Sequence, residues 1–319
     1  MWWDKPNKPQ KPEGPPFPFM KIRWMGFIVT AAIFIVTTWS LATQGLNMGL
    51  DFTGGVQVEA ASSEEPFNVE VLRKEIEGQG FKESSIVTSD NGHTAIIRVP
   101  LESGATVEEI KAKVTTGLKV DNVKIKLRKV DNVSGKVSEE LFSRGVLACL
   151  LAVAGIAAYV WFRFEVKFGT GAFITTFHDV YAVIGLWSIT QMTFDLTIVA
   201  GVLTVAGYSI NDTVVVYDRI REMLKKYKKL PIEQVIDISI TSTLSRTLMT
   251  SVTVMLASLA MIFLGGPVLF GFGVSILFGV IIGTYSSIFV AAPMLIILPG
   301  RIPGAKYRGG EGAVESAAS

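Results

Sequence analysis

The sequence holds little of the chemistry on which most enzymes and metal proteins depend. Its one cysteine, Cys149, lies in an apolar run, so no disulfide can form within the chain. The two histidines, His93 and His178, are far apart and suggest no zinc site. The sequence has no Gly-x-x-x-x-Gly-Lys-Ser/Thr phosphate loop, and no Ser/His/Asp arrangement stands out. We therefore expect no enzymatic activity, no metal and no bound cofactor.

Charged residues are also few, at 18% of the 319 residues, whereas hydrophobic residues make up 49%. The mean hydropathy of +0.43 is high for a chain of this length. A helix needs about 20 mostly apolar residues to cross a bilayer. Six segments meet this requirement, at about 24–46, 141–162, 169–190, 196–217, 244–264 and 268–298. The sequence thus predicts a polytopic α-helical membrane protein, whose last span is long and Gly-rich enough to be tilted or broken.

Lysine and arginine are distributed unevenly between the loops. They are concentrated before the first span, between the second and third, after the fourth and after the sixth, whereas the loops 191–195 and 265–267 have none. Cytoplasmic loops carry an excess of these residues. We therefore expect both termini and the basic loop near 218–243 to be cytoplasmic, with spans two to six within 138–300. The segment 47–137 would then be exported.

The segment 47–137 has the pattern of a small α+β domain. Strands are predicted at 56–60, 85–89, 94–99 and 123–130, and helices at 68–78 and 106–118. The order βαββαβ is ferredoxin-like. Outside it, the Pro-rich tail within 1–23 and the tail 301–319 are expected to be disordered. A short cytoplasmic helix after Lys229 has an apolar face, which we expect at the membrane interface.

Asp212 places a carboxylate inside the fourth predicted span. A charge in hydrocarbon costs several kcal/mol, so intramembrane carboxylates are rare and usually face a pathway or a partner. Ser209, Asn211 and Thr213 lie beside it and could hydrogen-bond it. Two roles are open: a place in a transport pathway, or a hydrogen bond that holds helices together.

Arg246 opens the fifth span on a polar stripe. The stripe consists of Ser242, Arg246, Thr250 and Thr253, which share one helical face. Arg246 is either a snorkelling terminal arginine or a counter-charge for Asp212. In the second case the cation opposes the desolvation of the carboxylate, giving a group that can take and release a proton.

Asp179, about midway along the third span and next to His178, is a further candidate. Two roles are open for it, as a proton relay or as a structural partner.

Three motifs together carry a resemblance that covers nearly the whole chain. Gly49-Leu-Asp-Phe-Thr-Gly-Gly55 follows the first span, Tyr208-Ser-Ile-Asn-Asp-Thr-Val-Val-Val-Tyr-Asp-Arg-Ile-Arg-Glu222 closes the fourth, and Thr243-Leu-Ser-Arg-Thr-Leu-Met-Thr-Ser251 opens the fifth. In sequence, order and spacing they resemble the SecF members of the SecD/SecF family, within the resistance-nodulation-division superfamily.

The resemblance implies a role in protein export. The family member pairs with SecD, assists the SecYEG translocon, and uses the proton gradient to promote movement of unfolded preprotein across the bacterial inner membrane. YajC, YidC and membrane lipid are further implied partners, and nucleic acid is not. By motif, proton transport falls on Asp212 and Arg246. Gly49, Asp51, Gly54 and Gly55 form a structural motif, in which glycine allows a tight chain reversal.

Two other functions compete with this one. A small-molecule or lipid exporter subunit of the same superfamily is the closer alternative, although such exporters usually carry much larger external domains. An intramembrane aspartyl protease is the more distant one, because Tyr217-Asp218 resembles half of a catalytic dyad. The second Gly-x-Gly-Asp motif that such a protease needs is absent from the sequence.

Overall fold

The computed structural model describes residues 17–62, 66–81, 84–89, 92–100, 107–117, 125–133 and 135–299. Several expectations fall outside these ranges. They are the disorder of residues 1–16 and of the tail from 300, and the starts of the helix at 106 and of the strand at 123. The chain divides into two compact units. One is made of residues 1–45, 152–189 and 200–319, and the other of residues 46–151 and 190–199.

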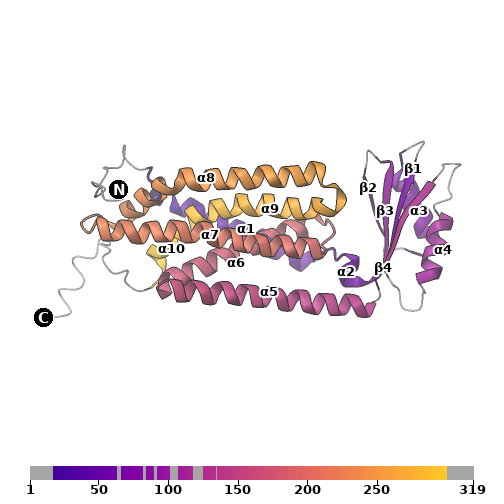
Figure 1. The fold of residues 1–319 in the computed structure, drawn as a ribbon, viewed down its shortest axis with the longest axis horizontal. Helices are drawn as coiled ribbons and strands as arrows, with labels where there is room; N and C mark the ends of the chain where they lie inside the picture. Colours follow the sequence, from indigo (N-terminus) through magenta and orange to yellow (C-terminus); the bar gives the residue numbers. More distant parts are fainter. Residues whose placement is uncertain are drawn as a thin grey trace, which may run out of the picture. The chain divides into compact units, whose positions relative to one another are not determined.

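The first unit is a bundle of long helices. Six helical segments are long and apolar enough to cross a membrane, which confirms the predicted number of spans. Five of them lie in α1 (Arg23–Thr43), α5 (Gly135–Arg163), α6 (Val166–Thr190), α7 (Leu196–Lys226) and α8 (Ile232–Leu264), labelled in Figure 1. The sixth, Val268–Ile297, lies in α9 (Gly266–Ser286) and the segment that follows it. A 3-10 turn, η1 (Phe19–Lys21), precedes α1. The molecule is therefore a multi-pass membrane protein.

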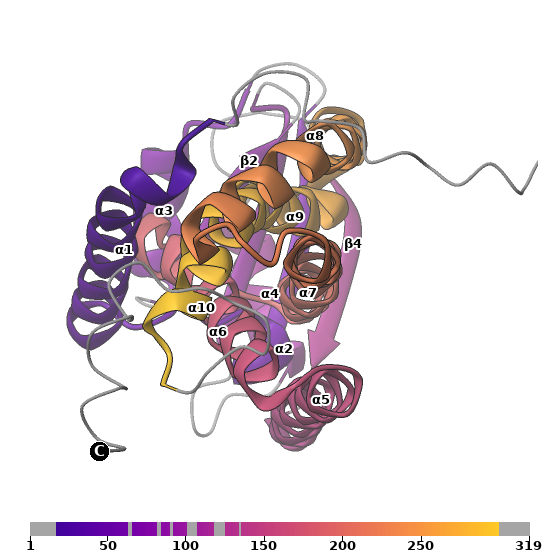
Figure 2. The ribbon, with the colours of Figure 1, turned by 90° about the vertical axis from the view of Figure 1, so that its left-hand side faces the viewer.

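Hydroxyl groups and glycines let the helices approach closely. The Ser40 hydroxyl lies 2.8 Å from that of Ser188, which joins α1 to α6. Gly185 of α6 faces Thr37 of α1, where any Cβ would clash. Small residues at such contacts are typical of helix pairs in membranes. The end-on view places α1 at the edge of the bundle and α8 beside α9 (Figure 2).

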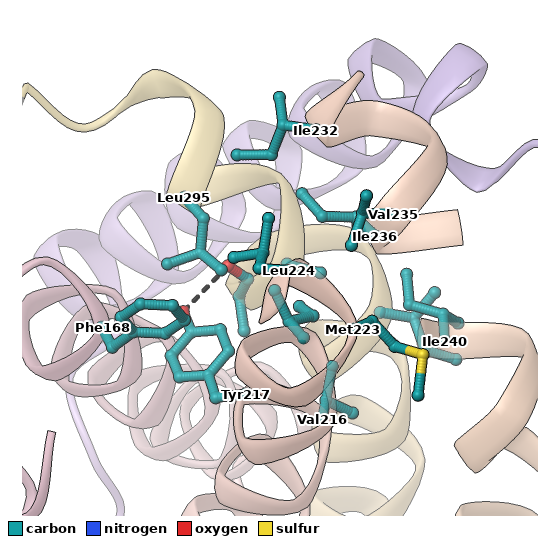
Figure 3. Close-up of a cluster of buried hydrophobic side chains, with 14 of the residues drawn as sticks. Phe168, Val216, Tyr217, Met223, Leu224, Ile232, Val235, Ile236, Ile240 and Leu295 are labelled. Atoms are coloured by element: carbon teal, nitrogen blue, oxygen red, sulfur yellow. Dashed lines mark hydrogen bonds between the residues drawn. The ribbon is translucent and has the colours of Figure 1, made fainter. Parts of the chain in front are cut away.

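The expected interfacial helix after Lys229 does not exist as a separate element, and this prediction was wrong. Residues 232–264 form one continuous helix, α8, with Pro231 as its N-cap. Its apolar face, Ile232, Val235, Ile236 and Ile240, is fully buried in a cluster with Val216, Tyr217 and Met223 of α7 (Figure 3). An apolar face on a helix indicates that the face is kept from water, but it does not tell whether lipid or protein covers it. Here other helices of the chain cover it.

The sixth span is interrupted, as its length suggested. After α9 the chain forms one turn of π-helix, η2 (Ser287–Ala291), which we call the π-turn. The short helix α10 (Ala292–Ile297) follows it. The interruption contains no glycine, so the Gly-rich sequence of this span is not its cause. Pro293 lacks a backbone N–H, and its ring would clash with the carbonyl of Phe289 in a regular α-helix. A π-turn just before it relieves this conflict.

The second unit contains the α+β domain. Its elements are α2 (Leu50–Thr53), β1 (Gly55–Ser62), α3 (Val69–Gly78), β2 (Ser85–Ser89), β3 (Thr94–Pro100), α4 (Val107–Gly117) and β4 (Ile125–Val133). The strands form an antiparallel sheet in the order β2-β3-β1-β4 (Figure 1). Leu72 and Ile76 of α3 and Ile110 and Val114 of α4 pack with the sheet in one core. The predicted ferredoxin-like fold is confirmed.

Candidate functional site

Asp212 lies in the middle of α7 and is only 6% exposed. The Thr247 hydroxyl of α8 donates a hydrogen bond of 2.9 Å to its Oδ1. Its Oδ2 is buried and has no hydrogen-bond partner within the described residues. Ser287, the first residue of the π-turn, is near enough to interact with the carboxylate, and its hydroxyl is 3.2 Å from that of Thr213. Asp212 is thus a buried carboxylate with one oxygen available.

Arg246 is not in direct contact with Asp212. It is exposed on α8, and the ion pairs within 4.0 Å among the described residues include none between the two. The two charges still interact at longer range. The polar stripe named from the sequence, Ser242, Arg246, Thr250 and Thr253, is exposed on this chain. The residue that reaches Asp212 is the next one along, Thr247.

A second polar stripe of α8 faces inward. Thr243, Thr247, Ser251 and Ser258 are all buried. Their spacing of four, four and seven residues places them on one helical face. This pattern is as visible in the sequence as the outward stripe, but periodicity alone does not say which of two polar faces turns toward the carboxylate.

Asp179 is fully buried in α6, and its hydrogen-bond partners come from α6, α7 and α9. His178 Nδ1 lies 2.8 Å from its Oδ1. The Ser209 hydroxyl of α7 donates to Oδ2, and the Ser286 hydroxyl at the end of α9 donates to the same oxygen at 2.7 Å. Sequence reasoning did not identify the two serines as donors to Asp179. The expectation that Ser209 could hydrogen-bond Asp212 was wrong, since its hydroxyl donates to Asp179 of α6 instead. The adjacency of His178 and Asp179 was the signal in the sequence that pointed toward this group.

The consecutive residues Ser286 and Ser287 lie near different carboxylates. Ser286 bonds to Asp179, whereas Ser287 lies by Asp212 and contacts Thr213. Adjacent residues on a helix project in different directions, because a turn takes 3.6 residues. The start of the π-turn therefore sits between the two buried carboxylates. Single-turn π-helices inside α-helices are frequent at functional sites.

The Gly49–Gly55 motif joins the α+β unit to the start of α7. Asp51 Oδ2 accepts a hydrogen bond of 3.0 Å from the Leu196 N–H, at the first residue of α7. Gly49 N–H donates to the Phe194 carbonyl at 2.7 Å. A negative charge at a helix N-terminus satisfies a free N–H and complements the helix dipole. The motif thus holds the first turn of the helix that carries Asp212.

Two glycines of this motif have backbone angles that side chains rarely adopt. Gly54 has φ of +72° and Gly55 has φ of +142°. A Cβ at Gly55 would also clash with the Val99 carbonyl and the Leu50 side chain. These angles turn the chain from α2 into β1.

Two acidic residues surround Arg98 near this motif. Burial lowers the pKa of Arg98, while the nearby carboxylates of Asp195 and Asp51 act in the opposite direction. Asp195 also accepts a hydrogen bond of 2.9 Å from the Thr197 N–H and so caps α7. The beginning of α7 is therefore capped by the carboxylates of Asp51 and Asp195.

Other ionisable groups of the bundle have ordinary partners. Asp218, which suggested half of a protease dyad, is half-exposed and pairs with Arg163 at 3.3 Å. Arg144 pairs with Glu140 one helical turn away. Within the described ranges, no group of three or more His, Cys, Asp or Glu residues could hold a metal ion.

Two family models match the chain. Residues 112–301 match the model of the protein export membrane protein SecD/SecF C-terminal region. Residues 39–64 match the model of the SecD/SecF GG motif. Together they contain Asp51, Gly54, Gly55, Asp179, Asp212 and Arg246.

Several named proteins are similar over most of their length. The protein translocase subunit SecF of Pseudomonas aeruginosa is 40% identical over 282 residues, which cover 88% of this chain and 90% of that protein. The subunit of the same name from Haemophilus influenzae is 39% identical, covering 86% and 85% respectively. The fold is also similar to the crystal structure of SecDF, a translocon-associated membrane protein from Thermus thermophilus. The TM-score is 0.76 at 35% identity, over 89% of this chain. The chain spans 38% of that longer SecDF chain.

Proposed function

Because the chain belongs to the SecD/SecF family of protein-export membrane proteins, we propose that it is the SecF subunit of a protein translocase. With SecD it uses the proton motive force to promote translocation of unfolded preprotein through SecYEG. The complex lies in the bacterial inner membrane with both termini of this chain cytoplasmic. The α+β domain is on the opposite side. YajC, YidC and lipid are its further partners, and the coupling ion is the proton.

The observation that carries this proposal is the buried carboxylate of Asp212. Its Oδ2 is available to receive a proton, while its Oδ1 is bonded to Thr247, the residue after Arg246. Proton binding removes the charge that attracts Arg246 and changes the link between α7 and α8. A proton that descends about 150 mV supplies about 3.5 kcal/mol. That energy biases a conformational equilibrium by a factor of several hundred.

The exposed position of Arg246 supports SecD as the partner of α8. An arginine that faced lipid at this depth would cost at least about 2.5 kcal/mol. The outward stripe of Ser242, Arg246, Thr250 and Thr253 would avoid that cost by facing another protein. SecD, which supplies the other spans of such a complex, covers this stripe and completes the proton path in our proposal.

Conformational changes reach the α+β domain through α7. Asp212 lies in this helix, and Asp51 of the Gly49–Gly55 motif caps its first turn. Movement of α7 then pulls on the segment that enters β1. Asp51 and the glycines of the motif transmit force in this scheme and take no part in proton transfer.

Asp212→Asn tests the coupling role. The variant keeps the size of the side chain and an oxygen that can accept the hydrogen bond from Thr247, but it cannot ionise. We expect proton-gradient-dependent stimulation of preprotein translocation in membrane vesicles to fall by at least about a hundredfold. Assembly with SecD, measured by co-purification, should be unchanged.

Asp218→Asn is the matched control, since Asp218 is on the same helix but half-exposed and paired with Arg163. It should retain stimulation. Wild-type stimulation in Asp212→Asn would contradict the coupling role, and failure of that variant to assemble would support a structural role for Asp212 instead.

A further inference from the structure

The His178–Asp179 pair is a second buried ionisable group in the bundle. His178 is 1% exposed and Asp179 is fully buried. Oδ2 of Asp179 accepts from two serine hydroxyls and Oδ1 faces His178 Nδ1, the arrangement of an ionised carboxylate that only accepts. The proton between the two side chains therefore belongs to Nδ1. This fixes the ring so that Nε2 is the atom able to gain or lose a proton.

His178 Nε2 has no hydrogen-bond partner within the described part of the chain, although it is buried. The ring lies between aromatic side chains, 5.8 Å from the Phe34 ring and 6.4 Å from the Tyr285 ring, measured between centroids. Burial of a polar atom without a hydrogen-bond partner is unfavourable. A residue that served only to donate to Asp179 would not need this second nitrogen, because a shorter amide or hydroxyl would do.

The helices around the pair supply few other ionisable groups. Tyr181 is on the same helix, α7 contributes Asp212 and Tyr208, α9 contributes Tyr285 and α8 contributes Arg246. Between residues 24 and 43, α1 has none. Asp212 is thus the other group in this region that can exchange a proton under ordinary conditions. The two sites share the start of the π-turn, where Ser286 bonds to Asp179 and Ser287 lies by Asp212.

We propose that His178 Nε2 is a second proton-binding site of the transport path, with Asp179 as its positioning residue. This inference rests on the proposed proton-coupled function. A hydronium ion gives its proton to the Nε2 lone pair, which forms an N–H bond, and leaves as water. The resulting imidazolium is balanced by the Asp179 carboxylate, as in other Asp–His pairs where the acid orients and stabilises the ring. Release reverses the step.

His178→Asn separates proton binding from structure. Its amide N–H can take the place of Nδ1–H toward Asp179, but the side chain has no atom at Nε2 and does not titrate. In proteoliposomes that contain the complex with SecD, we expect proton flux to fall at least about tenfold. Assembly and thermal stability should stay at wild-type values. His93→Asn, which changes the other histidine in the α+β unit, should leave flux unchanged.

Ring ¹⁵N spectra give a readout that a structural role would not move. In the His93→Asn background His178 is the sole histidine, because the chain has two. We expect its Nδ1 to remain protonated while the Nε2 signal shows gain of a proton when the sample is acidified. A constant Nε2 signal, or wild-type flux in His178→Asn, would overturn the inference.

The two proposals can fail separately. Loss of coupling in Asp212→Asn together with normal flux in His178→Asn removes only the role of His178. Normal coupling in Asp212→Asn removes the proposed function, while the ¹⁵N spectra still report whether His178 binds a proton.

Discussion

At the scale of single residues, the two buried carboxylates have different surroundings. Asp179 has contacts from His178 and two serines, whereas Asp212 has one donor and one oxygen without a partner in the described residues. Carboxylates in different environments can take different roles, and our proposal assigns proton exchange to Asp212. Both acids could be named from the sequence because a charge inside an apolar run is visible there. The hydroxyl donors Ser209, Ser286 and Thr247 could not be assigned to their carboxylates, because each comes from another helix.

Thr247→Val tests the bond that holds Asp212. Valine has nearly the shape of threonine but donates no hydrogen bond, so Oδ1 of Asp212 would lose its partner. Neither carboxylate oxygen would then have a donor within the described residues. We expect the free energy of unfolding, measured in mixed micelles, to fall by about 1–3 kcal/mol. Thr250→Val is the control, since that hydroxyl bonds only to the backbone of its own helix, and should change stability by less than about 0.5 kcal/mol. Equal effects of the two substitutions would argue against a specific bond.

At the scale of helices, α8 and the sixth span differ in how much of their structure the sequence pattern could predict. The apolar face of Ile232, Val235, Ile236 and Ile240 fits a membrane-surface helix and a helix buried in protein equally well. The structure buries it against α7 and η2–α10. The break in the last span follows from Pro293, a local feature, and so was within reach of sequence reasoning.

Ile236→Ala tests the burial of the first turns of α8. Removing a fully buried isoleucine leaves a cavity, and we expect the free energy of unfolding to fall by about 2–5 kcal/mol. Met249→Ala changes an exposed residue farther along the same helix and should have little effect. A loss below about 1 kcal/mol for Ile236→Ala would instead fit the membrane-surface position.

At the scale of the whole molecule, the chain consists of a helical unit and an α+β unit, and charge in the loops predicts the side of the membrane for each part. The α+β unit is expected outside the cytoplasm, and the basic loop after α7 inside. The exposed apolar residues of α1 and α5, such as Ile28, Trp39, Leu150 and Phe162, are suited to contact with lipid or another subunit.

Single cysteines test this orientation in a Cys149→Ser background. Glu77→Cys on α3 and Lys228→Cys after α7 both replace exposed residues. We expect a membrane-impermeant maleimide to label Glu77→Cys in intact cells and Lys228→Cys only after the inner membrane is opened. The reverse pattern would show that the chain is inserted the other way round.

The sequence by itself determined the six spans, the βαββαβ order and the identity of the buried acids. These depend on hydropathy and on periodicities within one element, which neighbouring residues along the chain decide. Only the tertiary structure decided that Thr247 rather than Arg246 touches Asp212, and that Asp51 caps α7. It also decided that Ser286 bonds to Asp179 while Ser287 contacts Thr213. The reason is that a membrane-spanning helix is apolar around most of its circumference. Its rotation about its own axis is therefore set by packing against other helices, and that rotation selects which polar side chains meet.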